Sequence, residues 1–376
     1  MYKTIFIFLQ CVAVNIALAD NAVVTIAHVG PVSGSYAFLG KDNENGAALA
    51  VDELNAEGVV IGGQKITIKL LKEDDAGDPR QGVSAAKRIV SANAVGVVGH
   101  VHSGISIPAS KIYSDAGIPQ ITPSSTSPVY SRQGLKTAFR VIADDTQVGR
   151  ALGRYAISVV GAKTVMVIDD GTTYGQGLAN EFKTEVEASG ASVIDRISVS
   201  DRATDFKSTF ANVKGKAPEV VFFAGADSVA GPLLRQMKSD GIAAKFLGGD
   251  ALCTKELIRV TSDVISDSQV ICGQPGGVEG TQKLVLDDFK KKFKSKFGSE
   301  VQLYAPFAYD AVKLMVSAMV QADSTEPQKY LSKMAALHYK GVTGDIDFDN
   351  KGDVKNGTIT LRTIRSGKFE EIAVVR

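Results

Sequence analysis

The chain has 376 residues, and its 42 Lys and Arg are balanced by 41 Asp and Glu, so the formal net charge is +1. This balance excludes the strongly basic surface that recruits nucleic acid or an acidic membrane, and we expect neither partner. The length exceeds what one hydrophobic core usually fills, which predicts two lobes of ordinary domain size.

The first residues have the pattern of a secretory signal peptide. Lys3 precedes an apolar run, residues 5–18, and a small-x-small site lies at its end, before Asp20. We expect residues 1–19 to be removed by cleavage after Ala19, so that the mature chain begins at Asp20 outside the cytoplasm. No later stretch reaches the ~20 apolar residues that a membrane helix needs.

Two cysteines follow the expected cleavage site, Cys253 and Cys272. They form an even pair in a chain that we expect to be exported, and each follows or ends a predicted strand. Disulfides persist in oxidising compartments outside the cytoplasm. We therefore predict a disulfide bond between Cys253 and Cys272.

Up to residue 122 the chain alternates between short apolar runs, typical of strands, and runs with helical periodicity. The predicted strands are residues 23–29, 65–71, 94–99 and 118–122, and the predicted helices are residues 43–55, 79–91 and 105–115. A glycine-bracketed loop, residues 30–40, lies between the first strand and the first helix. It is longer than the packing of a strand and a helix requires.

Two of these strands lead into polar turns. Residues 94–99 are followed by Ser103, and residues 118–122 by Ser124-Ser125-Thr126-Ser127. The carboxyl ends of parallel strands share one edge of an open sheet, where ligands bind, and N–H groups at helix starts suit an anion. We expect Ser103 and residues 124–126 to meet there in a ligand site; the alternative is that these hydroxyls only cap helices.

After residue 143 the alternation starts again. The predicted helices are residues 146–160, 175–189, 205–213, 228–240, 283–297, 306–321 and 327–337, and the predicted strands are residues 164–168, 191–197, 219–223, 245–247, 269–272, 358–362 and 369–374. Such alternation indicates parallel sheets with helices on both faces, so we predict an α/β fold with two doubly wound, Rossmann-like lobes. No proline-rich linker occurs, and we expect several short crossings between the lobes.

Signatures of catalysis and cofactor binding are missing from the sequence. No Gly-x-Gly-x-x-Gly motif follows the first strand, and residues 34–41 only approximate a P-loop, because the glycines are one residue too far apart and Asp42 replaces the magnesium-binding hydroxyl. No Gly-x-Ser-x-Gly or His-Glu-x-x-His motif occurs. We expect no cofactor and no catalysis, with an exported hydrolase as the remote alternative.

His100 and His102 are the candidates for a metal site. The chain has 4 histidines in all, and no Cys, Asp or Glu is clustered beside this pair. We expect no metal, and His100 to be a hydrogen-bonded residue at the end of a strand.

Two residues of the second lobe could complement the polar turns of the first. Tyr174 follows the predicted strand at residues 164–168, and Asp250 follows the strand at residues 245–247. Hydroxyls and amide N–H groups suit a carboxylate, whereas an acidic side chain suits an ammonium group. The alternatives are a Tyr174 ring packed under its loop and an exposed turn or cap at Asp250.

Five segments of the chain form an ordered set of motifs. They are GPVSGSYAFLGKDNENGAALAVDELNAEG, EDDAGDPRQGVSAAKRIV, GHVHSGISIPASKIYSDAGIPQITPSSTSP, DDGTTYGQG and DFDNKGDV. This set spans essentially the whole mature chain and closely resembles the periplasmic leucine/isoleucine/valine-binding proteins, which are type I solute-binding subunits of ABC transporters.

The resemblance implies a type I periplasmic binding protein fold and the function of a substrate-binding component of an amino-acid ABC importer, with branched-chain ligands expected first. It implies a monomer that binds the ligand between the lobes and is recognised by a membrane permease. The expected first lobe is residues 20–142 and 274–350, and the second is residues 143–273 and 351–376. The same fold could instead bind an amide, urea or aromatic acid, for transport or sensing.

The resemblance also implies roles for individual residues. Ser103 and Thr126 would hold the carboxylate of the ligand, and Tyr174 would close over it. The ammonium contacts would come from Ser124, Thr126 and Asp250. Asp250 is shorter by one methylene than the glutamate of the family.

The side-chain pocket departs further from the family. Its expected walls are Leu39, where the family has an aromatic residue, Ala226, where it has a tyrosine, the neighbouring Asp227, and the aromatic Tyr304. The frequent early disulfide of the family is missing, since non-cysteine residues stand at both of its positions.

Overall fold

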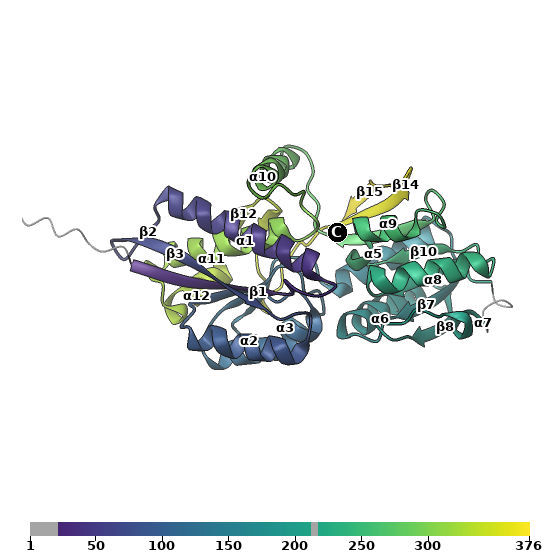
Figure 1. Cartoon of the computed structure of the whole chain (residues 1–376), viewed down its shortest axis with the longest axis horizontal. Coiled ribbons are helices and arrows are strands. Elements are labelled where there is room, and N and C mark those ends of the chain that lie inside the picture. Colours follow the sequence, from purple (N-terminus) through teal and green to yellow (C-terminus); the bar gives the residue numbers. More distant parts are fainter. Residues whose placement is uncertain (1–21, 212–216) are drawn as a thin grey trace, which may run out of the picture.

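The computed structural model describes residues 22–211 and 217–376, so the expected signal peptide and the start at Asp20 lie outside the described residues. The chain folds into two lobes that lie side by side (Figure 1). Each lobe is built on one large sheet with helices against both faces. The predicted α/β fold with two doubly wound lobes is confirmed.

The first lobe contains a six-stranded sheet in the order β2-β3-β1-β4-β5-β6, parallel except for the edge strand β2. Its strands are β1 (Ala22–Gly30), β2 (Val60–Ile61), β3 (Gln64–Asp74), β4 (Gly96–Gly99), β5 (Gln120–Thr122) and β6 (Ala138–Arg140). Its helices are α1 (Ala37–Glu57), α2 (Pro79–Ser91), α3 (Ser103–Asp115), α4 (Val129–Arg132), α10 (Gln282–Phe297), α11 (Ala305–Gln321) and α12 (Pro327–Ala336). A small hairpin, β12 (Tyr339–Gly341) and β13 (Gly344–Ile346), follows α12.

The second lobe contains a seven-stranded sheet in the order β15-β14-β11-β10-β9-β7-β8, in which the two terminal strands pair antiparallel. Its strands are β7 (Thr164–Asp169), β8 (Ser192–Ser198), β9 (Val220–Ala224), β10 (Lys245–Gly248), β11 (Val270–Pro275), β14 (Ile359–Arg365) and β15 (Lys368–Val375). Its helices are α5 (Asp145–Ser158), α6 (Thr173–Ala188), α7 (Lys207–Ala211), α8 (Asp227–Ser239), α9 (Lys255–Thr261) and the 3₁₀ turn η1 (Asp250–Leu252).

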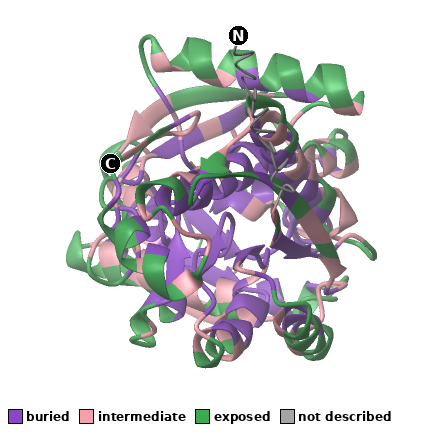
Figure 2. Ribbon diagram, turned by 90° about the vertical axis from the view of Figure 1, so that its left-hand side faces the viewer, coloured by how far each residue is buried: buried purple, intermediate pink, exposed green. Residues whose placement is uncertain are grey.

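Each central strand sends alternate side chains into cores on the two faces of its sheet. Ile26 of β1 packs in the core against α1 and α11, while Ala27 packs in the core against α2 and α3. Met166 and Val167 of β7 divide in the same way between the two cores of the second lobe. Buried residues therefore fill the layers, and exposed residues gather on the outer helices (Figure 2). Such two-sided burial is the reason that these strands have almost wholly apolar sequences.

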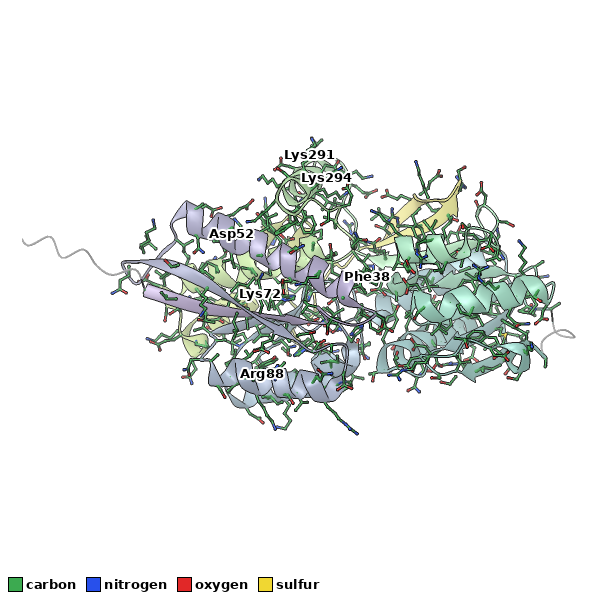
Figure 3. All side chains as sticks on the ribbon, in the orientation of Figure 1. Phe38, Asp52, Lys72, Arg88, Lys291 and Lys294 are labelled. Atoms are coloured by element: carbon green, nitrogen blue, oxygen red, sulfur yellow. A yellow bond between two sulfur atoms is a disulfide. The ribbon has the colours of Figure 1, made fainter. Side chains whose placement is uncertain are left out.

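Helix α10 lies at the rim of the first lobe (Figure 1). Within the helix only Phe289 and Phe293 are buried. Lys291 and Lys294 point away from the body of the protein (Figure 3). None of the described helices combines the length and the apolar character that crossing a bilayer requires.

Within the described residues the chain crosses between the lobes three times, after β6, after β11 and before β14, so the expected short crossings are confirmed. At the second crossing Gly276 has a φ of +96°, and its N–H donates to the carbonyl of Thr358 at 2.6 Å. A Cβ atom at Gly276 would lie 2.4 Å from the ring of Phe307, so only glycine fits there. The residue boundaries of the lobes stay predictions.

The predicted elements differ from the observed ones mainly at their ends. Helix α1 begins at Ala37 rather than at residue 43, so Leu39 lies on a helix and not in a loop. The start is set by Gly34, whose φ of +77° turns the chain and whose carbonyl accepts from the N–H of Ala37 at 3.2 Å. Strand β6, helix α9 and the hairpin β12–β13 were not predicted, because their short segments show no clear period.

Candidate functional site

The two polar turns of the first lobe meet at the carboxyl edge of its sheet, as predicted. Ser103 is the first residue of α3, after β4, and its hydroxyl accepts a hydrogen bond at 3.2 Å from the backbone N–H of Ser127, after β5. Ser103, Ser124 and Thr126 are each at most 4% exposed. Hydroxyls and backbone N–H groups from adjacent βα turns thus gather in one place.

The turn after β5 is held by hydrogen bonds to the turn after β4. The hydroxyl of Thr122 donates to the carbonyl of His100 at 3.0 Å and accepts from the N–H of Ser125 at 2.9 Å. The hydroxyl of Ser125 contacts that of Ser106 at 2.5 Å and lies 3.1 Å from the carbonyl of Val101. Ser125 therefore holds the turn together.

Arg140, at the end of β6, holds the turn after β5 through hydrogen bonds to its backbone carbonyls. Sequence reasoning missed this role. Its guanidinium is fully buried and donates to the carbonyls of Ser125 at 3.2 Å and Ser127 at 2.8 Å. It also donates to the carboxylate of Asp353 at 2.5 Å, next to the third crossing. The signal that could have revealed this role is a lone arginine inside the apolar run of residues 138–143.

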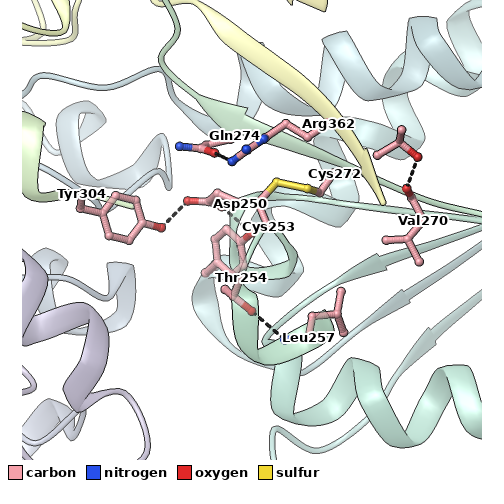
Figure 4. The surroundings of a disulfide bond; sticks show 11 residues. Asp250, Cys253, Thr254, Leu257, Val270, Cys272, Gln274, Tyr304 and Arg362 are labelled. Atoms are coloured by element: carbon pink, nitrogen blue, oxygen red, sulfur yellow. Dashed lines mark hydrogen bonds between the residues drawn. A yellow bond between two sulfur atoms is a disulfide. The ribbon is translucent and has the colours of Figure 1, made fainter. Parts of the chain in front are cut away.

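Asp250 is the acidic residue of the second lobe that was predicted to complement the polar turns of the first. It begins η1, after β10, and its Oδ1 accepts from the hydroxyl of Tyr174 on α6 at 2.7 Å. Its Oδ2 accepts from the hydroxyl of Tyr304, in the first lobe, at 2.5 Å (Figure 4). Burial raises the pKa of Asp250, and the two tyrosine hydroxyls oppose this shift. The Tyr304 bond joins the lobes, so the cleft is closed around Asp250.

Tyr304 is positioned by Asp42, the residue that breaks the P-loop pattern. The carboxylate of Asp42, on α1, accepts from four successive backbone N–H groups at the start of α11, those of Gln302, Leu303, Tyr304 and Ala305, at 2.7–3.0 Å. A carboxylate there satisfies N–H groups that a helix start leaves without a partner and complements the helix dipole. Asp42 thereby fixes the backbone that carries Tyr304.

Asp145, which sequence reasoning passed over, is a buried acid at the first crossing between the lobes. It is the first residue of α5, and its N–H donates to the carbonyl of Thr126 at 2.9 Å, across the first crossing. Its carboxylate is 1% exposed, and neither oxygen has a hydrogen-bond partner among the described residues. Burial raises the pKa of Asp145 well above its ordinary range. The sequence signal was a second acid beside Asp144, which already caps the helix.

The residues expected to surround the ligand side chain are not gathered in one cavity. Leu39 lines a cavity of about 730 Å³ between the lobes, beside the crossings. Asp227 lines a second interlobe cavity of about 940 Å³, where its carboxylate accepts from the hydroxyl of Thr254 at 2.6 Å. Ala226 is buried at the start of α8 and lines neither cavity. Ser103, Thr126 and Asp250 are closed off from both.

Two other predictions are confirmed near the site. Cys253 and Cys272 form a disulfide with a Cα–Cα distance of 5.7 Å, which ties the end of η1 to β11 (Figure 4). His100 is hydrogen-bonded, with Nδ1 at 2.8 Å from the carboxylate of Asp75 and Nε2 at 3.1 Å from the hydroxyl of Tyr113. The disulfide fixes the turn that carries Asp250, and the His100 contacts fix the end of β4.

Known proteins resemble this chain over most of its length. The family described as periplasmic binding protein matches residues 23–368. Leu/Ile/Val-binding protein homolog 1 of Brucella abortus is 34% identical over 361 residues, which cover 94% of each chain. The leucine-, isoleucine-, valine-, threonine- and alanine-binding protein of Pseudomonas aeruginosa is 32% identical over 90% of this chain and 89% of its own.

A solved structure agrees with these relatives. The branched-chain amino acid transporter substrate-binding protein LivJ of Streptococcus pneumoniae, in complex with isoleucine, superposes with a TM-score of 0.83, is 25% identical and covers 94% of this chain and 98% of its own. These matches cover about nine tenths or more of each chain, so they include both lobes. The chain belongs to the periplasmic binding protein family.

Proposed function

We propose that this protein is the substrate-binding component of an ABC importer and binds an α-amino acid, with leucine, isoleucine or valine expected first, in the cleft between its lobes. The observation that carries the proposal is the chemical contrast across the closed cleft. The first lobe contributes the hydroxyls of Ser103 and Thr126 and nearby N–H groups, and the second contributes the carboxylate of Asp250. An α-amino acid carries the two groups that complement this contrast.

In this proposal the carboxylate of the ligand accepts hydrogen bonds from Ser103, Thr126 and the turn after β5. The ammonium group lies between the carbonyl of Ser124, the hydroxyl of Thr126 and Asp250, while Tyr174 covers the ligand. The hydroxyl of Thr126 is buried and has no hydrogen-bond partner among the described residues, which leaves it available for a ligand. Aromatic acids and neutral amides would leave Asp250 without a cation and are disfavoured.

The preference for aliphatic side chains rests on two kinds of support. Leu39 and Ala226 are small or aliphatic and leave room where the family has aromatic rings. The relatives are named as binders of leucine, isoleucine and valine, and the Streptococcus protein holds isoleucine. Tyr304 and Asp227 would complete the walls of this pocket, and Asp227 also lines the interlobe cavity of about 940 Å³.

The localisation and partner follow from the same function. We infer that the precursor is cleaved after Ala19 and that the mature protein, a monomer, works in the periplasm without catalysis. Closure of the lobes over the ligand would present the surface that the membrane permease recognises. N-terminal sequencing of exported protein should begin at Asp20, and a start at Cys11 with attached lipid would contradict this inference.

The decisive experiment is calorimetry of the purified mature protein against a panel of leucine, isoleucine, valine, benzoate, urea and acetamide, joined with mass spectrometry of ligand carried through native purification. We expect a branched-chain amino acid to bind with a Kd at or below the micromolar range, and no turnover. Binding of benzoate or an amide in preference to every amino acid would overturn the proposal.

A further inference from the structure

The cavity of about 730 Å³ beside the crossings has no role in the proposed function. This crossing-side cavity is bounded by helix α10 of the first lobe and by strands β14 and β15 of the second (Figure 1). The structure describes all the residues expected to contact the amino acid, and of these only Leu39 lines the cavity. Its volume lies in the range of pockets that hold small organic ligands. It is therefore a candidate for a second binding site.

The walls of the crossing-side cavity contain apolar side chains from both lobes. They are Leu286 on α10 and Phe307 on α11 from the first lobe, and Ile258 on α9 and Phe369 on β15 from the second. Phe307 belongs to the core of the first lobe, whereas the other three side chains are only partly buried. A ligand with an apolar body would remove their remaining surface from water, which is favourable.

The charged residues of the same walls are unevenly paired. Each of the three acids that line the cavity forms an ion pair with a lysine: Glu371 with Lys283 at 3.2 Å, Asp287 with Lys290 at 3.3 Å, and Glu300 with Lys294 at 2.6 Å. Three cations that line it, Lys255, Arg362 and Lys368, form no ion pair among residues 22–211 and 217–376. The cavity therefore offers positive charge to a ligand, while its negative charge is already compensated.

Arg362, on β14, is the partly buried cation among these three. Its guanidinium donates one hydrogen bond, to the side-chain oxygen of Gln274 at 3.2 Å (Figure 4), and lies 5.5 Å from the centre of the Phe369 ring. Burial lowers the pKa of Arg362, and the carboxylate of Glu371 opposes this shift. A guanidinium has five N–H donors in a planar fork that matches a carboxylate. Arg362 therefore presents donors beside an apolar wall.

We propose that the crossing-side cavity is a second ligand site, which binds a carboxylate carried on an apolar chain, as in a medium-chain fatty acid. The carboxylate accepts hydrogen bonds from Arg362, and the chain lies along Leu286 and Phe369. A neutral ligand leaves the guanidinium without an anion, and an α-amino acid adds an ammonium group to an excess of positive charge. The site thus goes beyond the proposed function and selects a different class of molecule.

A ligand in this cavity would contact both lobes at once. Lys283 on α10 and Glu371 on β15 already pair across it. Cys253 and Thr254, which closely follow Asp250, also line it. A ligand that fits this arrangement of the walls favours it over arrangements in which the lobes are displaced. Binding in the crossing-side cavity should therefore strengthen binding in the cleft, and the converse.

The test is calorimetry of the mature protein saturated with leucine, with octanoate as the probe and octanamide as its neutral counterpart. Arg362→Gln is compared with Arg365→Gln, which changes an arginine of the same strand with 55% side-chain exposure that lies outside the cavity. We expect octanoate to bind one to one and octanamide on the order of tenfold more weakly. Arg362→Gln should weaken octanoate binding on the order of tenfold, and the control by less than about twofold.

A second variant tests the cavity without changing its charge. Leu286→Trp fills the space beside α10 and should abolish octanoate binding, while leucine affinity in the absence of octanoate stays within about twofold in every variant. Competition between octanoate and leucine, equal binding of octanoate and octanamide, or full octanoate binding by both Arg362→Gln and Leu286→Trp would each overturn the second site. A wild type that binds octanoate but no amino acid would overturn the proposed function and leave this site standing.

Discussion

At the edge of the first lobe, Thr122 and Ser125 donate to backbone carbonyls and hold their turn in a fixed shape. At the edge of the second lobe, the carboxylate oxygens of Asp145 have no hydrogen-bond partner among the described residues, and Asp250 takes one of its two tyrosine partners from the opposite lobe. The hydroxyls of the first edge are uncharged and are held in place by their own lobe, with the guanidinium of Arg140 behind them. The second edge carries charge and is completed only by closure. The contrast teaches that the first lobe fixes the shape of the site, whereas the second lobe contributes the negative charge that a bound cation would neutralise.

The largest effect should come from removing the guanidinium that supports the first edge. Arg140→Met leaves Asp353 and two carbonyls of the binding turn without their donor, so the free energy of unfolding should fall by roughly 3–5 kcal/mol. Urea unfolding measures this change. The control is Arg132→Met, a half-exposed arginine on α4, which should change stability by at most about 0.5 kcal/mol. Equal effects of the two variants would show that Arg140 does not hold the turn.

Acid should place a charge on a histidine that is buried in the first lobe. His28 on β1 is fully buried, both ring nitrogens lack partners among the described residues, and burial lowers its pKa to about 4. In the unfolded chain His28 has its ordinary pKa of about 6.5, so the unfolded state takes up the proton first as the pH falls. The free energy of unfolding is therefore highest above pH 6.5 and decreases by about 3 kcal/mol as the pH falls to 4. Unfolding from pH 7 to pH 4 measures it, and His28→Asn should flatten the curve. A pH dependence shared by both proteins would contradict this assignment.

A somewhat smaller effect should follow from neutralising the second edge. Asp250→Asn removes the negative charge that we expect to contact the ammonium group of the ligand. The binding free energy of the preferred amino acid should therefore weaken by roughly 1.5–3 kcal/mol, with little change in the free energy of unfolding. Thr126→Ala should cost a similar amount, because its hydroxyl contacts the same end of the ligand. Calorimetry decides both, and unchanged affinity in Asp250→Asn would mean that the ligand lies in another orientation.

The smallest effect should come from the side-chain end of the cleft. Asp227 is bound to Thr254 and borders the cavity of about 940 Å³ rather than the enclosed polar site. Asp227→Asn should therefore leave recognition of the α-carboxylate and ammonium intact and change only which side chain binds best. A panel of amino acids should show a changed ranking with leucine affinity within about threefold, that is, within ~0.7 kcal/mol. A uniform loss across the panel would place Asp227 at the shared end of the ligand.

The sequence predicted the fold and part of the candidate site, for a physical reason. Apolar strands followed by polar turns are local signals, and they were enough to bring Ser103 and Thr126 to one edge and to pair Cys253 with Cys272. Arg140 and Asp42 could not be found in this way. Their partners lie 213 and about 260 residues away, so their roles exist only in the folded chain.

The burial of Asp145 and the placement of the side-chain pocket residues could not be predicted for a different reason. Asp145 stands beside a conventional helix cap, and nothing in its neighbours distinguishes a buried carboxylate from an exposed one. Leu39 and Asp227 were expected to line the same side-chain pocket; in the structure Leu39, on the first turn of α1, lines the cavity of about 730 Å³, and Asp227 lines the cavity of about 940 Å³. Which residues share a cavity depends on how the lobes meet, and no local pattern encodes that.

The hydrogen bond between Tyr304 and Asp250 has an optical consequence. The chain contains 10 tyrosines and no tryptophan, so its intrinsic emission comes from tyrosine alone. A tyrosine that donates to a carboxylate is quenched, and Tyr304 makes this contact across the cleft only when the lobes are together. Opening of the cleft should therefore raise the tyrosine emission. Phe38 lines both interlobe cavities, so a tryptophan in its place would be the single tryptophan of the chain, and its emission would report closure of the lobes.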